Sequence, residues 1–174
     1  MANDTSAQWG SAEWAQAQDT PKGRLEAELI DATRANQVAT EKMDEAATCA
    51  LGINRTDGLC LDVIDRSGRL SAGSLAEQAS LTTGAVTAVV DRLEAKGFVR
   101  RVPDPADRRR VLIELTDLAR ERSWELYGPL GERGRRHLER CSAAELELLI
   151  DFMRFGTELN EQRAAEIRAE LENG

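Results

Sequence analysis

The apolar and polar positions of this 174-residue chain follow the period of an α-helix over most of its length. The clearest such segment spans residues 83–95, where apolar side chains recur at spacings of three and four. These side chains are Val86, Val89, Val90, Leu93 and Ala95. Thr82 or Thr83 is suited to cap the start of this helix, and Gly97 is suited to end it in a left-handed conformation. A shorter helix is predicted over residues 71–80, so the two helices form a helix-turn-helix.

After Gly97 the pattern changes from the period of a helix to that of a strand. Residues 98–116 read FVRRVPDPADRRRVLIELT, in which Val111, Ile113 and Leu115 occupy alternate positions. The central Asp104-Pro105-Ala106-Asp107 is a typical turn sequence. We therefore predict a two-stranded ribbon, or wing, after the second helix. In a winged helix-turn-helix the second helix enters the DNA major groove and the wing lies over the neighbouring backbone or minor groove.

Further helices are predicted before this segment. One begins at Pro21, continues to about Thr48 and has a sparse apolar face. The next contains the apolar stretch 59–64 and ends at Arg66-Ser67-Gly68. A short strand is then expected around Arg69-Leu70, where it could pair with the wing.

Two long helices are predicted after the wing. The first begins at Thr116 and contains Gly128-Pro129, which predicts a kink or break. Ser142 and Glu145 have the spacing of a capping box, which begins the last helix. Its apolar face consists of Leu146, Leu149, Ile150, Met153 and Leu159, with Ile167 and Leu171 further on. Because this stripe is too long for so small a core to cover, we expect a second copy of the chain to cover it.

The pattern thus predicts a mainly α fold with a small β-wing, in which N- and C-terminal dimerisation helices flank a winged helix-turn-helix. We expect a mobile arm at residues 1–20 despite Trp9 and Trp14, and a dimerisation helix at residues 21–50. The DNA-binding domain is expected at residues 51–116, followed by C-terminal dimerisation helices at residues 117–174.

The distribution of charge supports an anionic partner for the wing. The chain has a formal net charge of -8, yet residues 92–110 contain seven basic and three acidic side chains. A basic island in an acidic chain is typical of a phosphate-binding face. The alternative is a solvated hairpin whose arginines pair with Asp104 and Asp107.

The sequence also resembles a known family. The stretches VVDRLEAKGFVRR and DPADRRR, the latter followed by Leu115-Thr116, are similar to the winged helix-turn-helix of the multiple-antibiotic-resistance regulator (MarR) family. The specific resemblance covers about Leu51 to Thr116, and flanking helices extend it more weakly. It implies a homodimer that binds palindromic operator DNA, usually as a repressor, and is often released by a small ligand.

DNA-contacting residues are expected on the second helix, on its approach and on the wing. They are Ser71, Ser74, Thr82, Thr83, Gly84, Thr87, Ala88, Arg92, Asp107, Arg108, Arg109 and Arg110. Arg109 stands in the family's Asp-x-Arg pattern, so the resemblance implies that it enters the minor groove while Asp107 holds it. Arg108 and Arg110 are expected to contact phosphate. Arg92 either contacts phosphate or forms a structural pair with Asp91.

The outward positions of the second helix, Thr83, Gly84, Thr87, Ala88 and Asp91, carry short side chains. A threonine can reach a base edge or phosphate, and its methyl or that of Ala88 can pack on a thymine methyl. No Arg, Gln or Asn stands in the middle of this face to make a bidentate purine contact. Sequence readout is therefore expected to rely more on the wing and on DNA shape.

Other chemistry has little support in the sequence. His137 is the single histidine and has no identifiable nucleophile beside it, and paired-cysteine metal motifs and glycine-rich phosphate loops are missing. We therefore expect neither enzymatic activity nor a cofactor or metal. Without an apolar run of about 18–20 residues or a signal peptide, the protein is expected to be cytoplasmic and not to bind membranes.

Three further possibilities stay open. Cys60 is expected to be a small core residue, whereas Cys49 and Cys141 are candidates for thiol-based redox sensing. A winged helix can also serve as a protein-interaction module, with its arginines meeting an acidic protein. A small aromatic ligand near Trp124 and Tyr127 is expected mainly from the resemblance, and the alternative is that Trp124 belongs to the core.

Overall fold

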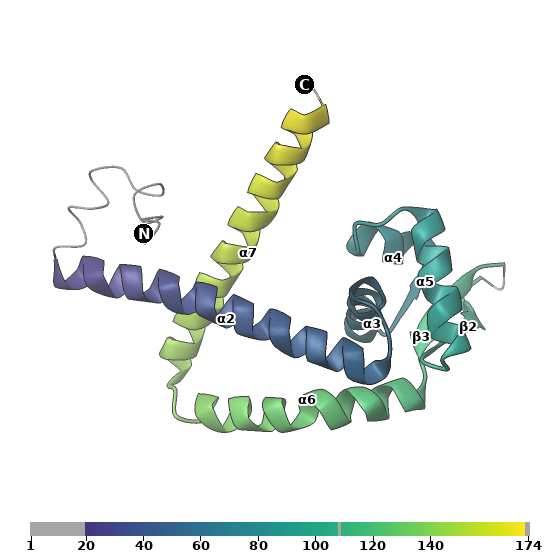
Figure 1. The fold of residues 1–174 in the computed structure, drawn as a ribbon, viewed down its shortest axis with the longest axis horizontal. Coiled ribbons are helices and arrows are strands. Elements are labelled where there is room, and N and C mark those ends of the chain that lie inside the picture. Colours follow the sequence, from purple (N-terminus) through teal and green to yellow (C-terminus); the bar gives the residue numbers. More distant parts are fainter. Residues whose placement is uncertain (1–19, 108, 173–174) are drawn as a thin grey trace, which may run out of the picture. The chain divides into compact units, whose positions relative to one another are not determined.

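The computed structural model describes residues 20–107 and 109–172, so the expected arm at residues 1–20 falls almost entirely outside them. The chain divides between Ala119 and Arg120 into two compact units, and this boundary lies near the start of α6. The elements are α2 (Pro21–Leu51), α3 (Arg55–Ser67), β1 (Arg69–Ser71), α4 (Ala72–Gln78), α5 (Thr83–Ala95), β2 (Val99–Pro103), β3 (Val111–Leu115), α6 (Asp117–Leu138) and α7 (Ala143–Glu172) (Figure 1). The predicted mainly α fold with a small β-wing is confirmed.

Polar side chains define where the helices begin. The Thr82 hydroxyl accepts a hydrogen bond of 3.2 Å from the Ala85 amide, so Thr82 is the cap of α5. Ser71 caps α4 through a 3.1 Å bond from the Ser74 amide. The Thr116 hydroxyl accepts from the Ala119 amide at 3.2 Å, at the predicted start of α6. Each bond satisfies an amide that has no partner within its own helix.

Gly97 determines how the chain leaves α5. It has a φ of 75°, and its amide donates to the Glu94 carbonyl at 2.9 Å. The Phe98 amide donates to the Leu93 carbonyl, also at 2.9 Å. These two bonds form a Schellman motif, which needs the left-handed residue that the sequence predicted at this position. As a result Phe98 and Val99 are buried where β2 begins.

Three antiparallel strands form the sheet, in the order β1-β3-β2. The predicted short strand is therefore present, and it pairs with β3. Glu114 on β3 lies opposite Arg69 of β1 and Arg100 of β2. Both arginines donate to the buried Glu114 carboxylate, Arg100 at 2.6 Å through Nη2. The hydrogen bond from Arg100, and then that from Arg69, lowers the pKa of Glu114, although burial opposes this change.

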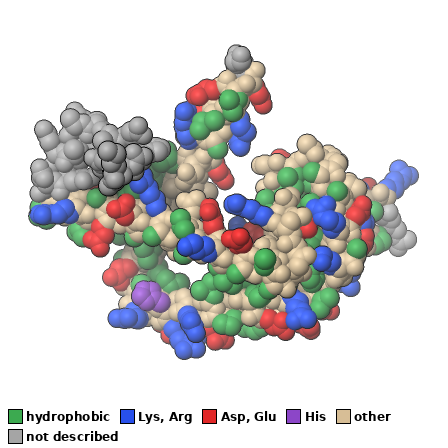
Figure 2. Space-filling model, viewed as in Figure 1, with side chains coloured by type: hydrophobic (Ala, Val, Ile, Leu, Met, Phe, Trp, Pro, Cys, Tyr) green, Lys and Arg blue, Asp and Glu red, His purple; other side chains and the backbone are tan. Residues whose placement is uncertain are grey.

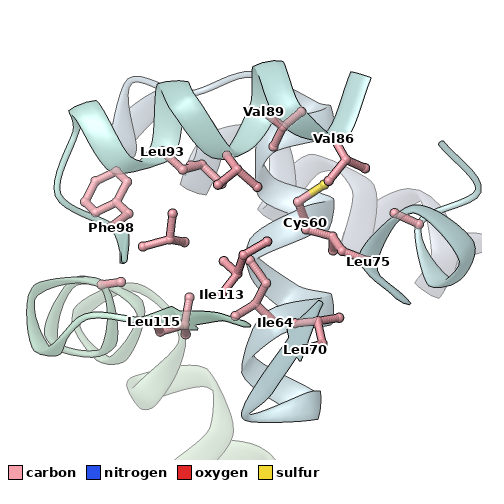
Figure 3. Packing of buried hydrophobic residues seen from close by; sticks show 14 of the residues in the cluster. Cys60, Ile64, Leu70, Leu75, Val86, Val89, Leu93, Phe98, Ile113 and Leu115 are labelled. Carbon is pink, nitrogen blue, oxygen red and sulfur yellow. The ribbon is translucent and has the colours of Figure 1, made fainter. Parts of the chain in front are cut away.

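The core of the first unit lies between α3, α4, α5 and the sheet (Figure 3). From α5 it contains Val86, Val89, Val90 and Leu93, as the spacing predicted. Ala95 is exposed, so its predicted place in the stripe is wrong, because α5 ends there and the chain turns at Gly97. Cys60 is fully buried, which confirms it as a core residue, and burial raises the pKa of its thiol.

Helix α6 continues through Gly128-Pro129, so the break that was one of the two predicted outcomes is wrong, and the kink stays a prediction. An internal proline removes its own amide hydrogen bond and crowds the carbonyl four residues earlier, but the helical turns on both sides are present here. Gly128 has a separate role here. A Cβ at this position would lie 2.9 Å from ring atoms of Trp124, so the glycine leaves room for the indole one turn earlier.

Helix α7 begins with the predicted capping box. The Ser142 amide donates to the Glu145 carboxylate at 2.7 Å, and the Glu145 amide donates to the Ser142 hydroxyl at 3.3 Å. None of the 30 residues of α7 is buried in the single chain. Its exposed large apolar side chains are Leu148, Leu149, Ile150, Phe152, Met153, Phe155, Leu159, Ile167 and Leu171. Neither α7 nor any other described helix is long and apolar enough to cross a membrane.

Replacing Glu114 with Gln should lower the free energy of unfolding by about 1–2 kcal/mol near neutral pH, because two partly hydrated arginines lose an ionised partner. The pKa of Glu114 is lower in the folded chain than in the unfolded chain. Its contribution is therefore complete above the unfolded pKa and is lost as the pH falls through the folded pKa. Urea denaturation at fixed protein concentration, from about pH 7 to about pH 3.5, measures this difference.

Glu77→Gln is the matched control, because Glu77 is an exposed residue of α4 without an ion pair among the described residues. It should change the free energy of unfolding by less than about 0.5 kcal/mol. The role assigned to Glu114 would be wrong if the two variants were equally stable at neutral pH. A difference between Glu114→Gln and wild type that grows in acid would also contradict it.

Candidate nucleic-acid interface

Helix α5 presents one buried face and one exposed face. Thr83, Gly84, Thr87 and Ala88 are all exposed, as predicted for the outward positions. The Thr87 hydroxyl donates a 3.0 Å hydrogen bond to the Thr83 carbonyl within the helix. The outward surface of α5 therefore carries only short side chains at these positions, and the Thr87 hydroxyl is already hydrogen-bonded within the helix.

The guanidinium of Arg92 binds the carboxylate of Asp57 on α3. Arg92 Nη2 lies 2.6 Å from Asp57 Oδ1, and Nε donates to Oδ2 at 3.3 Å. Asp57 is only 2% exposed, and its hydrogen bond raises the pKa of Arg92. The alternative that Arg92 pairs with Asp91 is wrong, because Arg92 reaches back to α3. The predicted contact of Arg92 with phosphate stays a prediction. To make it, the guanidinium would have to bind Asp57 and a phosphate at the same time.

Arg101 of β2 binds two carboxylates of α5. Its Nη2 lies 2.6 Å from Asp91 Oδ1, and its Nη1 contacts the Glu94 carboxylate. The hydrogen bond from Arg101 to Asp91 is the main reason that the pKa of Arg101 is raised. Arg92, Arg100 and Arg101 thus all have acidic partners within the chain. The net positive charge counted over residues 92–110 therefore overstates the charge available to a partner, because these three arginines are already paired.

The wing tip differs, because its acidic residues build the turn. Asp104 Oδ1 accepts from the Ala106 amide at 2.8 Å, and Asp107 Oδ1 accepts from the Arg109 amide at 3.0 Å. The Arg110 amide donates to the Asp107 carbonyl at 2.8 Å. Asp107 thus contacts the backbone of Arg109, and the predicted role of this contact in minor-groove insertion stays a prediction. Basic side chains gather at the edge of the molecule where Figure 1 places the β2–β3 loop (Figure 2).

The guanidinium groups of Arg109 and Arg110 make no ion pair with any described residue. The alternative in which the wing arginines pair with Asp104 and Asp107 is therefore not what the structure shows for these two. Arg108 lies outside the described residues. The wing tip therefore presents the guanidinium groups of Arg109 and Arg110 on a turn whose backbone is held by hydrogen bonds.

The remaining predicted contact residues have local partners. The hydroxyls of Ser71 and Ser74 lie 3.0 Å apart at the start of α4, and Thr82 caps α5. Each hydroxyl can still accept or donate one further hydrogen bond. Their predicted DNA contacts stay predictions.

The predicted ligand residues lie on α6 in the second unit. Trp124 is 67% exposed in the single chain. Tyr127 is partly buried. In the first unit a small open cavity of about 180 Å³ is lined by Ala72, Thr87, Val90, Arg101, Val111 and Ile113. An aromatic ligand at Trp124 and Tyr127 stays a prediction.

The cysteines and acidic groups show no built metal centre within the described residues. Cys49 is exposed and Cys141 partly exposed, so both are accessible thiols. Their redox role stays a prediction.

Comparison with known proteins identifies the family. The MarR family model matches residues 53–111, which contain α3, α4, α5, β1 and β2. The HTH-type transcriptional regulator YcgE of Bacillus subtilis (strain 168) is 33% identical over 147 residues, which cover 84% of this chain and 96% of YcgE. The chain belongs to the MarR family. It is therefore a member of a family of winged-helix transcription regulators, and this membership assigns it no catalytic activity.

Solved structures with the same fold support this assignment. RV1404 from Mycobacterium tuberculosis matches with a TM-score of 0.57 at 21% identity, over 76% of this MarR-family chain and 92% of RV1404. NadR, solved in complex with 4-hydroxyphenylacetate, matches with a TM-score of 0.54 at 23% identity, over 72% of this chain and 88% of NadR. At these identities the likeness concerns the fold.

The Asp57–Arg92 pair should be energetically coupled in this MarR-family chain. Arg92→Gln leaves a buried carboxylate without its cation and should lower the free energy of unfolding by about 2–3 kcal/mol. Asp57→Asn should have a smaller effect, and the double variant should lose less than the sum of the two single variants. Urea denaturation of the four proteins gives a coupling energy, expected to be about 1–2 kcal/mol.

The exposed pair Arg66–Asp62, with 2.8 Å between Nη2 and Oδ2 within α3, is the control for this cycle. Its coupling energy should stay below about 0.5 kcal/mol, because both groups are hydrated. Additive effects of Asp57→Asn and Arg92→Gln would show that the buried pair does not stabilise the position of α5.

Proposed function

We propose that this chain is a homodimeric regulator that binds double-stranded DNA at a palindromic operator. Helix α5 would enter the major groove, and the β2–β3 loop would lie over the neighbouring minor groove. The observation that carries this proposal is the pair Arg109 and Arg110, which lack acidic partners among the described residues. Phosphate oxygens and the negative potential of the minor groove would provide the anionic partner that these guanidinium groups lack within the chain.

The acidity of the whole chain is compatible with this function. Residues 1–53 and residues 142–174 each have a net charge of -5, so acidic side chains concentrate towards the two ends of the sequence. Screening at physiological salt acts over about 8 Å, so charges in direct contact with DNA outweigh distant ones. Arg109 and Arg110 stand at the tip of a projecting loop, where they would be in direct contact.

The apolar side chains that the single chain leaves exposed support assembly as a homodimer. On α7 the structure exposes Leu149, Ile150 and Met153, which the sequence assigned to an apolar face. On α2 it exposes Leu25 and Leu29. A second copy would cover these faces, and it would place two α5 helices at half-sites about 34–36 Å apart. An obligate interface of this kind should bury more than about 2,000 Å² in total.

Repression, with release by a small aromatic molecule, completes the proposal. NadR, which shares this fold, was solved with 4-hydroxyphenylacetate. In this chain the exposed indole of Trp124 and the neighbouring Tyr127 are the aromatic groups on α6 that could hold such a ligand. Salicylate-like compounds that bind there should raise the thermal stability of the protein and weaken its DNA binding.

Arg109→Ala should weaken binding to an operator selected from random DNA by about 1–3 kcal/mol, and it should lower the salt dependence of binding by about one unit of slope. The reason is the loss of one cationic contact from the wing tip. Fluorescence anisotropy at several salt concentrations measures both quantities.

Arg66→Ala is the matched control, because Arg66 is paired with Asp62 on α3 and has no place at the wing. It should bind as wild type does. If Arg109→Ala forms a folded protein that binds as tightly as Arg66→Ala, the wing tip does not contact DNA. If wild type binds DNA without any salt dependence, the proposed function itself is wrong.

Ile150→Lys should prevent assembly, because a charge would then lie in the apolar face that a second copy covers. Wild type should scatter light at micromolar concentration with about twice the 19.2 kDa of one chain. The variant should give either monomers or loss of cooperative unfolding. Glu147→Lys introduces the same side chain at an exposed polar position of α7 and should remain dimeric. A well-folded 19.2 kDa wild-type species would contradict the dimer.

A further inference from the structure

We infer that Thr87 selects thymine in the major groove through its γ-methyl group, and not through a hydrogen bond to a base. This inference rests on the proposed function and specifies what α5 reads. Thymine is the base whose major-groove edge carries a methyl group, so an apolar contact at this position distinguishes it from the other three bases.

The hydroxyl of Thr87 is already hydrogen-bonded within α5. It donates to the Thr83 carbonyl at 3.0 Å, so its only proton is used inside α5. A threonine in this rotamer is a poor donor to guanine N7 or O6, or to thymine O4. Its oxygen can still accept, but the major-groove donors are adenine N6 and cytosine N4, and thymine itself has none. The γ-methyl remains as the apolar part of the same exposed side chain.

The longer polar side chains of α5 are engaged in ion pairs. Arg92 is bound to Asp57 at 2.6 Å, and Asp91 is bound to Arg101 at 2.6 Å. Glu94 also binds Arg101. Because α5 contains no Asn, Gln or Lys, no long side chain within it is available for a bidentate contact with a purine.

Small residues beside Thr87 allow α5 to approach the bases closely. Gly84 lies three residues before Thr87, and a Cβ added there would meet no atom within 4 Å. Ala88, the next exposed position, has only a methyl side chain. Apolar atoms must come within about 4.0–4.5 Å to be in contact, and small neighbours permit this distance for a short side chain such as Thr87.

The experiment uses the full-length protein and an operator that this protein has selected from random DNA. Each thymine of a half-site is replaced in turn by deoxyuridine, which removes the methyl and keeps the base pair. One of these replacements should weaken binding about fourfold, and about 15-fold when both half-sites carry it. A T·A pair replaced by 5-methylcytosine·G at that position should bind more tightly than one replaced by C·G.

Two variants of Thr87 separate its methyl from its hydroxyl. Thr87→Ser keeps the hydroxyl and its bond to Thr83 but loses the methyl, so it should bind the thymine operator about fourfold more weakly per half-site and lose its sensitivity to deoxyuridine. Thr87→Val keeps a γ-methyl and loses the hydroxyl, so it should keep the sensitivity to deoxyuridine that Thr87→Ser loses. Thermal unfolding confirms that both variants are folded.

Several outcomes would overturn the inference while leaving DNA binding intact. One is that Thr87→Val binds weakly and Thr87→Ser binds normally, because the hydroxyl then makes the contact. Others are that no deoxyuridine replacement matters, or that Thr87→Ser retains the full deoxyuridine effect. If the protein selects no sequence and shows no salt-dependent binding to DNA, the proposed function fails, and this inference fails with it.

Discussion

The buried carboxylate of Asp57 is the constraint on which the position of α5 depends. A carboxylate that is 2% exposed is costly without a cation, and the cation comes from Arg92, 35 residues later on α5. The pair therefore fixes the rotation of α5 against α3 as well as its distance. Apolar packing of Val86, Val89 and Leu93 would tolerate a small rotation, whereas a two-point contact between guanidinium and carboxylate is far more directional.

Two further carboxylates extend this constraint to the wing. Glu94 and Asp91 bind Arg101, which ties the exposed edge of α5 to β2. Glu114 binds Arg69 and Arg100, which ties the three strands together on the opposite side of the sheet from Ile113. Around the helix-turn-helix and the sheet, Arg69, Arg92, Arg100 and Arg101 thus have acidic partners that set the geometry of the first unit. Arg109 and Arg110 at the wing tip have no such partner among the described residues.

The sequence was informative where structure is decided locally. Caps at Thr82 and Ser142, and the left-handed turn at Gly97, depend on residues within three or four positions, and these were predicted correctly. The ion-pair partners of Arg92, Arg100 and Arg101 could not be predicted from such neighbouring residues. Arg92 and its partner are 35 residues apart, and Arg69 and Glu114 are 45 residues apart, so only the fold brings them together.

Two local predictions were also wrong for physical reasons. Ala95 fits the apolar spacing, but α5 ends at this residue, so no core lies beneath it. Gly128-Pro129 has the composition of a helix break, yet the 22-residue helix α6 continues through it, and the glycine accommodates the Trp124 ring. Of the candidate site, the exposure of α5 and the turn at the wing tip were predictable. The separation of its arginines into paired and unpaired groups was not.

Helix α7 shows why assembly and folding should be linked in this protein. A helix of 30 residues with no buried side chain gains stability only from its intrinsic propensity and from surface pairs such as Arg163–Glu166, at 3.0 Å, which contribute little each. Packing against another surface is what normally stabilises such a helix. In the proposed dimer that surface is a second copy. The folded species would then already carry two α5 helices, so no separate association step would precede binding to a two-fold symmetric site.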